Sequence, residues 1–341
     1  MQFYHFVIIY YLFVNVLAFF LYFLDKKKAE ASDWRIPERT LIFFAALGGA
    51  LGAYAGMHIW HHKTRKVKFQ IGVPVWFCIH LVLICFVTWQ NNHLVITKYQ
   101  VDAGLDCRIV QVSDLHNVVL WWNQDYIADQ VRELEPDLIV LTGDIIDANH
   151  MDLEAALYTA GELAKITDTY YVSGNHEYWL SQEDRLSLYQ GLKERGVCVL
   201  SDEYVMMEEY QEPFMLIGLE DNHLGNGTLQ EILQKSEDLS EIEDSEGMED
   251  SISILLAHEP QYIPYYANAG IDYVLTGHAH GGQWILPGIG PVYAPDQGFQ
   301  PEFTAGEVRR GSTLMIISRG LGNSVIPIRL FNYPELVVVD F

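Results

Sequence analysis

The chain has 341 residues, of which half are hydrophobic, and a formal net charge of −24 at pH 7. Residues 1–100 carry ten Lys and Arg against four Asp and Glu, whereas the remainder carries eleven against forty-one. This acidic remainder would repel a polyanion, so we expect no nucleic-acid binding. The four cysteines form no Cys-x-x-Cys pair, which argues against a zinc ribbon or a redox motif.

Three apolar runs predict an all-α transmembrane region of two to three segments, which we place in an anchor domain at residues 1–93. Phe3–Leu24 is uncharged, long enough to span a bilayer, and lacks the features of a cleaved signal peptide. Leu41–Trp60 contains four glycines spaced along one helix face, where helices can approach closely. Gly72–Trp89 ends at a tryptophan typical of a membrane interface.

Basic residues gather in the two loops between these runs, at 25–40 and 61–70. The positive-inside tendency favours both loops in the cytoplasm, but three full spans would place them on opposite sides. A re-entrant second segment would reconcile them and would put the N-terminus and residues 94–341 outside. Three conventional spans could put residues 94–341 on either side; we favour an extracytoplasmic location for them.

About residues 5–75 also resemble a small bacterial membrane domain of unknown function. The matching positions are Asn15, Asp25-Lys26, Trp34-Arg35-Ile36-Pro37-Glu38, Gly48-Gly49, Gly52, Gly56 and His62-Lys63-Thr64. The resemblance implies a membrane location and nothing about chemistry. His62-Lys63-Thr64 could bind a lipid headgroup, but we favour a solvated basic loop.

From about Leu94 onward, short apolar runs alternate with amphipathic stretches, which indicates an α/β domain at residues 94–341. The predicted strands are Arg108–Ser113, Leu138–Thr142, Tyr170–Ser173, Phe214–Leu219, Ser253–Ala257, Tyr273–Thr276, Leu314–Ser318 and Leu336–Asp340. The predicted helices are Gln124–Leu134, Asp152–Lys165, Gln182–Arg195 and Leu229–Lys235. Ser236–Ser251 is strongly acidic, and we interpret it as a solvated loop or insertion.

Five short polar segments each follow an apolar run that is predicted to be a strand. They are Asp114-Leu115-His116, Gly143-Asp144-Ile145-Ile146-Asp147, Gly174-Asn175-His176-Glu177, Ala257-His258-Glu259 and Gly277-His278-Ala279-His280-Gly281. Residues after strand ends meet at one edge of an α/β sheet. Two divalent ions need a shared carboxylate, further oxygen ligands and several imidazoles. The residues that supply this set are Asp114, His116, Asp144, Asn175, His258, His278 and His280, so we predict a dinuclear metal site.

These segments resemble the calcineurin-like metallophosphoesterase family over about residues 105–341. The resemblance implies a two-sheet sandwich flanked by helices. It also implies one metal held by Asp114, His116, Asp144 and His280, and another held by Asp144, Asn175, His258 and His278. A metal-bridging hydroxide would then attack phosphorus in line. Mixed imidazole and oxygen ligands favour manganese, iron or zinc, with manganese as the working choice.

By the same resemblance, His176 is the general acid for the departing alkoxide. Its partner is Asp147 or Glu177, and only geometry can decide between them. In phosphoprotein phosphatases an arginine follows the aspartate that corresponds to Asp147. Here Ala148 and Asn149 follow Asp147 instead. The likeness is greater to small bacterial phosphodiesterases, some of them membrane-anchored.

We therefore predict a membrane-anchored hydrolase of phosphodiester or pyrophosphate bonds. Its expected partners are a small or lipid-linked phosphoester as substrate and the membrane lipids around its anchor. The alternatives are a phosphomonoesterase or protein phosphatase, and a non-catalytic membrane sensor that keeps its metals for structure. The sequence does not determine the oligomeric state.

Overall fold

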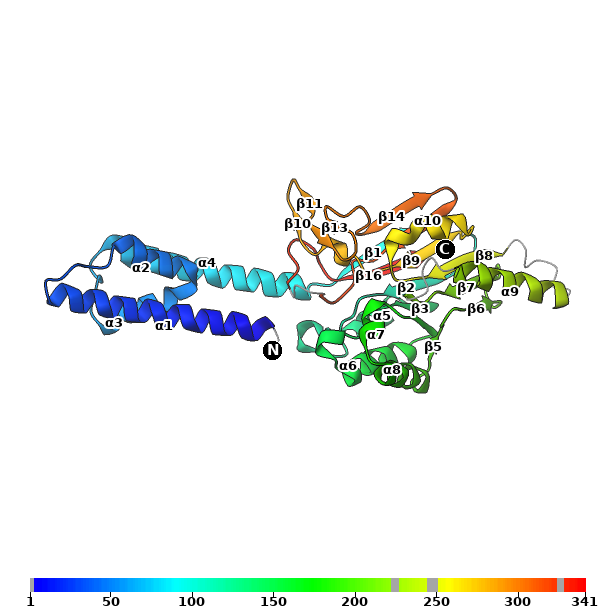
Figure 1. The fold of residues 1–341 in the computed structure, drawn as a ribbon, viewed down its shortest axis with the longest axis horizontal. Coiled ribbons are helices and arrows are strands. Elements are labelled where there is room, and N and C mark those ends of the chain that lie inside the picture. Colours follow the sequence, from blue (N-terminus) through cyan, green and yellow to red (C-terminus); the bar gives the residue numbers. More distant parts are fainter. Residues whose placement is uncertain (1–2, 222–226, 244–250, 324–327) are drawn as a thin grey trace. The chain divides into compact units, whose positions relative to one another are not determined.

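The computed structural model describes residues 3–221, 227–243, 251–323 and 328–341. It divides the chain into two compact units, Met1–Trp89 (unit 1) and Gln90–Phe341 (unit 2), which are described separately below (Figure 1).

Unit 1 is built from helices. They are α1 (Phe3–Glu30), α2 (Glu38–Phe44), the π-helical turn η1 (Ala45–Gly49), α3 (Ala50–Ile59) and α4 (Val67–Asn92), whose last turn belongs to unit 2. Three segments are long and apolar enough to cross a membrane, which agrees with the three predicted runs: Val7–Glu30, Glu38–Ile59 and Val67–Asn92.

The middle segment turns back on itself. Gly48 has a φ of +111°, which interrupts the helix. Asn15, midway along α1, donates to the carbonyl of Gly48 (2.9 Å) and accepts the N–H of Gly52 (2.8 Å). These bonds satisfy backbone groups that the break would leave unpaired in an apolar environment. Ile36 and His62, which flank the segment, both contact Asp25 at the other end of α1 (2.9 and 2.7 Å). The segment is therefore a helical hairpin whose two flanks both lie next to Asp25.

The glycines of this hairpin allow α3 to pack closely against α1. A Cβ atom at Gly49 would lie 2.8 Å from the Cβ of Ala18, and one at Gly56 would lie 2.9 Å from the Cβ of Tyr22. At Gly52 the space is tighter still, because the carbonyl of Asn15 occupies it. The predicted small-residue face is confirmed, and its partner is α1 of the same chain.

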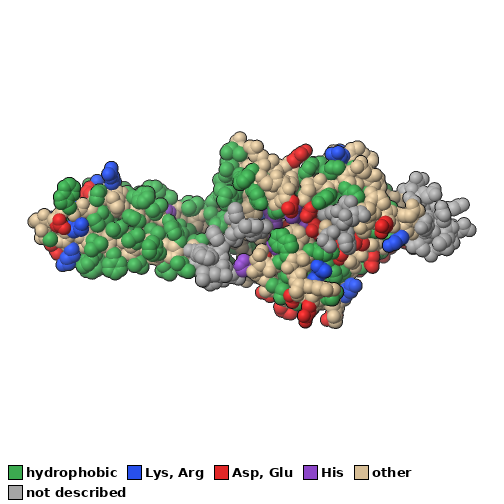
Figure 2. Space-filling model, viewed as in Figure 1, with side chains coloured by type: hydrophobic (Ala, Val, Ile, Leu, Met, Phe, Trp, Pro, Cys, Tyr) green, Lys and Arg blue, Asp and Glu red, His purple; other side chains and the backbone are tan. Residues whose placement is uncertain are grey.

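On the face seen in Figure 2, charged side chains gather at one end of unit 1 and hydrophobic side chains cover much of the remainder. Asp25 is fully buried there and contacts Arg35, His62 and Lys63 at 3.1, 2.7 and 3.2 Å. Lys63 also pairs with Glu38 at 3.0 Å. Only 7% of His62 and 8% of Lys63 is exposed, so the prediction of a solvated loop is wrong for these two residues.

Unit 2 contains two six-stranded mixed sheets. The first sheet has the order β1 (Val95–Gln100), β16 (Glu335–Asp340), β2 (Arg108–Val112), β3 (Leu138–Thr142), β4 (Thr169–Val172) and β5 (Val197–Val199). The second has the order β14 (Gly306–Arg310), β15 (Thr313–Ile317), β9 (Tyr273–Thr276), β8 (Ile252–Leu256), β7 (Phe214–Gly218) and β6 (Glu203–Met207). Strands β2 to β5 are parallel in the first sheet, as are β15, β9, β8 and β7 in the second.

Helices flank both sheets, which gives the predicted two-sheet sandwich. Those packed on the first sheet are α5 (Tyr126–Glu133), α6 (Leu153–Ala164) and α8 (Gln182–Glu194); those on the second are α9 (Thr228–Glu243) and α10 (Ile263–Asn268). Short hairpins follow β9: β10 (Ile285–Leu286) with β11 (Gly290–Pro291), and β12 (Tyr293–Ala294) with β13 (Gly298–Phe299).

Strand β3 shows why the central strands are continuously apolar. Leu138 and Val140 point into the core between the two sheets, whereas Ile139 and Leu141 point into the core beneath the helices. Successive side chains face opposite sides of a strand, so a strand covered on both faces needs an apolar residue at every position.

All eight predicted strands are present, within one or two residues at their ends, and four of the longer strands were not predicted. The missed strands are β1, β5, β6 and β14. All four predicted helices are also present. The loop prediction at 236–251 is wrong up to Glu243, because α9 continues to that residue; residues 244–250 lie outside the described part of the chain.

Candidate metal centre

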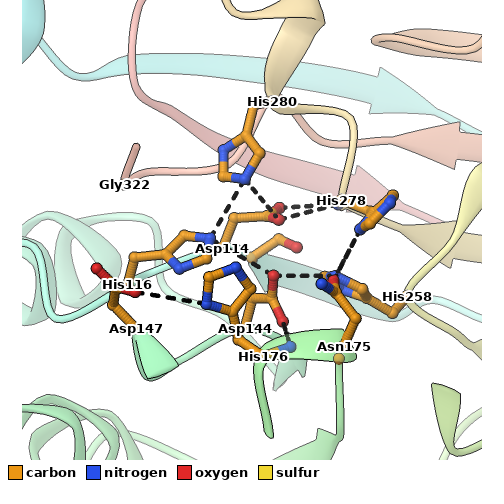
Figure 3. A network of polar contacts seen from close by, with 12 residues as sticks. Asp114, His116, Asp144, Asp147, Asn175, His176, His258, His278, His280 and Gly322 are labelled. Atoms are coloured by element: carbon orange, nitrogen blue, oxygen red, sulfur yellow. Dashed lines mark hydrogen bonds and ion pairs between the residues drawn. The ribbon is translucent and has the colours of Figure 1, made fainter. Parts of the chain in front are cut away.

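The seven predicted ligands lie together where the strands of both sheets end (Figure 3). Asp114 and His116 follow β2, Asp144 follows β3, and Asn175 begins the short helix α7 (Asn175–Trp179) after β4. From the second sheet, His258 follows β8, and His278 and His280 follow β9. Parallel strands direct the chain toward the same edge, so residues distant in sequence converge there.

Most of these ligand residues occupy a backbone conformation that bulky L-residues rarely adopt. The φ angles of Asp114, His116, Asp144, His278 and His280 lie between 44° and 65°. Left-handed conformations of non-glycine residues cost free energy and cluster at functional sites, where the surrounding structure holds them. The sharp turns aim these side chains at one point instead of along the strand direction.

One group of side chains forms the first candidate centre: Asp114, His116, Asp144 and His280, whose ligand atoms lie within 4.8 Å of one another. His280 Nε2 is 3.5 Å from Asp114 Oδ1, and His116 Nε2 is 3.5 Å from Asp144 Oδ2. The two Nε2 atoms of His116 and His280 face each other at 3.2 Å. All four residues are buried.

The second candidate centre shares Asp144 with the first. His258 Nε2 lies 3.3 Å from Asp144 Oδ2 and 3.2 Å from Asn175 Oδ1. His278 Nδ1 lies 2.9 Å from Asn175 Oδ1 and 3.2 Å from His258 Nε2. The Asp144 carboxylate therefore borders both groups, which is the position that a bridging ligand requires.

The electrostatics of the site favour a cation between these side chains. Burial lowers the pKa of His116 to about 3, and it lowers that of His280 well below its ordinary value, so both rings offer lone pairs. Burial also opposes a proton on His258, but the Asp144 carboxylate outweighs this effect and raises the pKa of His258. Facing imidazole nitrogens share at most one proton, whereas a divalent ion can satisfy both, so the residues present fit a metal pair.

Glycines leave the space that the ligands occupy. A Cβ atom at Gly277 would lie 2.4 Å from Asp114 Oδ2, and one at Gly174 would lie 2.4 Å from Asp144 Oδ1. Gly143, with a φ of +86°, would bring a Cβ within 2.5 Å of His258 Nδ1. A side chain at any of these three positions would therefore collide with a candidate ligand residue.

His176 lies beside the first centre and contacts two groups through Nδ1. This nitrogen is 3.2 Å from the backbone N–H of Ala148, which donates to it, and 3.5 Å from Asp147 Oδ1. Burial alone would lower the pKa of His176, but the carboxylates of Asp147 and Asp144 outweigh it and raise the pKa. Nε2 is then the ring nitrogen left to carry a proton toward a substrate.

Glu177 has a different position, because its carboxylate accepts backbone N–H groups. Oε2 accepts from Gly174 and Asp144 (2.7 and 2.9 Å), and Oε1 accepts from Ile145 (2.9 Å) and, more weakly, from Ile146 (3.3 Å). Glu177 thus joins the loop after β3 to the start of α7. The geometry favours Asp147 over Glu177 as the partner of the His176 ring.

Sequence comparison assigns both regions to families. A model described as "Calcineurin-like phosphoesterase" matches residues 107–282. The chain belongs to this calcineurin-like phosphoesterase family. A second model, described as "Protein of unknown function (DUF1294)", matches residues 15–69. Together with the two ligand clusters, the family supports a metal-dependent phosphoesterase with two divalent ions.

Relatives of this phosphoesterase include a bacterial and an animal protein. The uncharacterized metallophosphoesterase YkuE of Bacillus subtilis is 30% identical over 68% of this chain and 77% of its own length. A transmembrane protein with a metallophosphoesterase domain from Bos taurus is 30% identical over 80% of this chain and 63% of its own length. A solved dimetal phosphatase from Danio rerio is 14% identical, with a TM-score of 0.40 over 64% of this chain and 88% of that chain.

The phosphoesterase centre also contains outer residues that the sequence did not reveal. His278 Nε2 contacts Asp296 Oδ2 at 2.9 Å, and His258 Nδ1 donates to the carbonyl of Thr142 at 2.7 Å. Such partners fix which ring nitrogen faces the ion. Asn332 Nδ2 donates to the carbonyl of His280 at 2.7 Å, and the buried Arg329 lies 3.4 Å from His280 Nδ1. No sequence motif marks these outer residues; they can be recognised only from their contacts in the folded structure.

Two further polar side chains near the centre have structural partners in the phosphoesterase unit. Arg319 pairs with Glu335 at 2.6 Å. His150, which follows Asp147 by three residues, contacts its carboxylate at 2.9 Å.

Proposed function

We propose that the chain is a membrane-anchored phosphoesterase that hydrolyses phosphodiester or pyrophosphate bonds with two divalent ions, manganese being the working choice. The observation that carries the proposal is the Asp144 carboxylate, which borders both ligand groups, with His176 next to it. Asp114, His116, Asp144 and His280 would hold one ion, and Asp144, Asn175, His258 and His278 the other. When bound, the ions would supply Lewis-acid activation of water and of the phosphoryl oxygens.

The chain's own groups have separate tasks in this proposal. His176 would hold a proton on Nε2 for the leaving oxygen, while Asp147 and the Ala148 N–H orient its ring through Nδ1. Glu177 is a positioning residue, because it fixes the backbone of Asp144. The site offers no arginine after Asp147 that could clamp a terminal phosphate, which supports a diester over a monoester.

The membrane geometry supports an extracytoplasmic phosphoesterase. Both flanks of the middle segment contact Asp25, which supports a re-entrant segment. The basic residues at 26–39 and at 63–68 would then lie on the same side of the membrane. The positive-inside tendency places that side in the cytoplasm, and α4 then carries the chain to the other side. A C-terminal fusion to alkaline phosphatase should be active in bacterial cells, whereas a fusion to green fluorescent protein should not fluoresce; the reverse pattern would contradict this orientation.

The activity test uses the full chain in detergent, stripped of metal and then supplied with Mn²⁺. We expect hydrolysis of bis-p-nitrophenyl phosphate to exceed that of p-nitrophenyl phosphate. Asp144→Asn should lower diester turnover by about a thousandfold or more, because each centre loses its shared carboxylate. Glu162→Gln, at a carboxylate of α6 that pairs only with Lys165 among the described residues, is the control and should be unchanged. Faster monoester turnover would favour a phosphomonoesterase, and a folded but inactive protein would favour the non-catalytic sensor.

A further inference from the structure

Two loops of unit 2 expose large apolar side chains next to the phosphoesterase centre. The short helix η2 (Leu120–Trp122) leaves 80% of Trp122 and 38% of Trp121 exposed, whereas Leu120 is buried and fixes the turn. In the other loop, 45% of Phe331 is exposed. Exposed tryptophans in a loop are unusual in a soluble surface and typical of a contact with lipid or with a partner.

The backbone holds these aromatic residues outward at a cost. Trp121, Trp122 and Phe331 have φ angles of 53°, 56° and 53°. The left-handed region is disfavoured for bulky L-residues, and glycine would fit each position without that cost. Because 80% of Trp122 is exposed, packing in the core does not account for an aromatic residue at that position.

Both loops are tied to the residues that end a candidate membrane span. The span Val67–Asn92 closes with Gln90, Asn91 and Asn92, which belong to unit 2. Asn92 Oδ1 accepts the N–H of Trp121 at 2.7 Å, and Gln90 Oε1 accepts the N–H of Phe331 at 2.8 Å. The two apolar loops therefore lie at the point where the chain would leave the bilayer.

The same loops continue into the first candidate metal centre. Three residues separate His116 from Leu120, at the start of η2. Asn332, next to Phe331, donates to the carbonyl of His280 at 2.7 Å. The β10–β11 hairpin adds the exposed Ile289, and its Ile285 N–H bonds the carbonyl of Leu330 at 2.9 Å; Figure 2 shows hydrophobic side chains over this hairpin.

We infer that Trp121, Trp122 and Phe331 dock unit 2 on the membrane surface from which the C-terminal end of α4 emerges. The centre would then act on phosphoesters whose lipid tails stay embedded in the bilayer. The choice of substrate rests on the proposed phosphodiesterase function, but the docking does not. Residues 101–341 are strongly acidic, so anionic headgroups would repel them. Tryptophan and phenylalanine at the interface supply apolar contact without that repulsion.

The first test measures docking without reference to activity. The full chain is placed in nanodiscs made of lipids with or without bromine on their acyl chains, which quenches nearby tryptophan fluorescence. The chain has eight tryptophans, and Trp122→Phe removes one fluorophore while keeping an aromatic ring. We expect the quenched fraction of emission to fall in Trp122→Phe. Equal quenching in both proteins would overturn the docking, and the exposed loops would then fit a protein partner instead.

The second test measures substrate class with Trp122→Gly, which also relieves the left-handed backbone. Hydrolysis of phosphatidylcholine, a zwitterionic phosphodiester embedded in the nanodisc, should fall by roughly tenfold as interfacial apolar contact is lost. Turnover of bis-p-nitrophenyl phosphate and the unfolding temperature should not fall. Leu186→Ser, at an exposed leucine of α8 outside these loops, should change neither activity.

The possible failures can be told apart. If the soluble diester is cleaved but no bilayer phosphodiester is, the lipid-linked substrate is overturned. If Trp122→Gly lowers both activities equally, the loop shapes the centre and does not select lipid. If neither diester is cleaved by folded, metal-loaded protein, the proposed function fails, while the quenching result still decides the docking.

Discussion

Units 1 and 2 both bury carboxylates among basic side chains, but they balance the charge in different ways. In unit 1, Asp25 is neutralised by Arg35 and Lys63 and also contacts His62. In unit 2, Asp114 and Asp144 have imidazoles as their ion-pair partners and also accept backbone N–H groups. Among the described residues, no Lys or Arg pairs with either.

This difference separates a structural network from a site that needs an ion. Buried charges are tolerated when paired, and unit 1 provides that pairing within the chain. The carboxylates of unit 2 repel each other, and two of the rings beside them, His116 and His280, have a lowered pKa that favours their neutral form. A divalent pair completes that balance, so removing metal should affect the two units unequally.

Metal removal is the largest expected effect on stability. With free Mn²⁺ at roughly 100–1,000 times its dissociation constant, binding stabilises unit 2 by about 3–4 kcal/mol relative to the stripped protein. Hydrogen-exchange mass spectrometry of the full chain should show faster exchange after chelation at the loops following β2, β3, β8 and β9. Exchange in α1 and α3 should be unchanged. If chelation accelerated hydrogen exchange equally in both units, unit 2 would not depend on metal more than unit 1 does.

Neutralising Asp25 should reverse this pattern and destabilise unit 1. Asp25→Asn leaves Lys63 and Arg35 without their buried carboxylate, at a cost of about 3 kcal/mol. Thermal unfolding in detergent, followed through exchange in α1 and α3, measures the loss. Glu30→Gln removes an exposed carboxylate of the same helix, which pairs with lysines on the surface, and should cost below about 1 kcal/mol. Similar losses in both variants would show that burial does not matter here.

The convergence of the candidate ligand residues could be predicted from the sequence because each follows an apolar strand within a compact motif. The proximity of Asp114, Asp144 and His258 can be predicted from a single rule, that residues after strand ends meet at one edge of the fold. The two-sheet sandwich came from the family resemblance, since alternating strands and helices alone indicate only an α/β domain.

Partners brought together by tertiary packing could not be predicted in this way. Asp296 lies in a loop between short strands, and nothing in its local sequence distinguishes it from other acidic loop residues. The burial of His62 and Lys63 depends on Asp25, nearly forty residues earlier. The hairpin form of the middle segment was likewise not predictable from local sequence, because it depends on Asn15 of α1, which bonds the carbonyl of Gly48 and the N–H of Gly52.

Asp296 offers a sharper test of the second metal centre. Asp296→Asn weakens the contact that orients His278, so metal affinity should fall by about 10–100-fold. Titration of Mn²⁺ into the stripped full chain, followed by calorimetry, measures this directly. Glu302→Gln changes an exposed carboxylate nearby in sequence and should leave the affinity unchanged. An unaltered affinity in Asp296→Asn would show that His278 is held by Asn175 and the loop backbone alone.

The smallest expected effect is a dependence of unit 1 stability on pH through His62. Burial lowers the pKa of this ring below its ordinary value, and the contact with Asp25 offsets only part of the shift. The unfolded chain then takes up the proton first, so stability is lost as pH falls below about 6.5 toward the folded-state pKa. The slope is at most about 1.4 kcal/mol per pH unit.

His62→Gln keeps a donor for Asp25 but cannot titrate. Between pH 7.5 and 5.5, α1 and α3 of the original chain should therefore lose more stability than those of His62→Gln; parallel curves would mean that Asp25 keeps His62 protonated throughout.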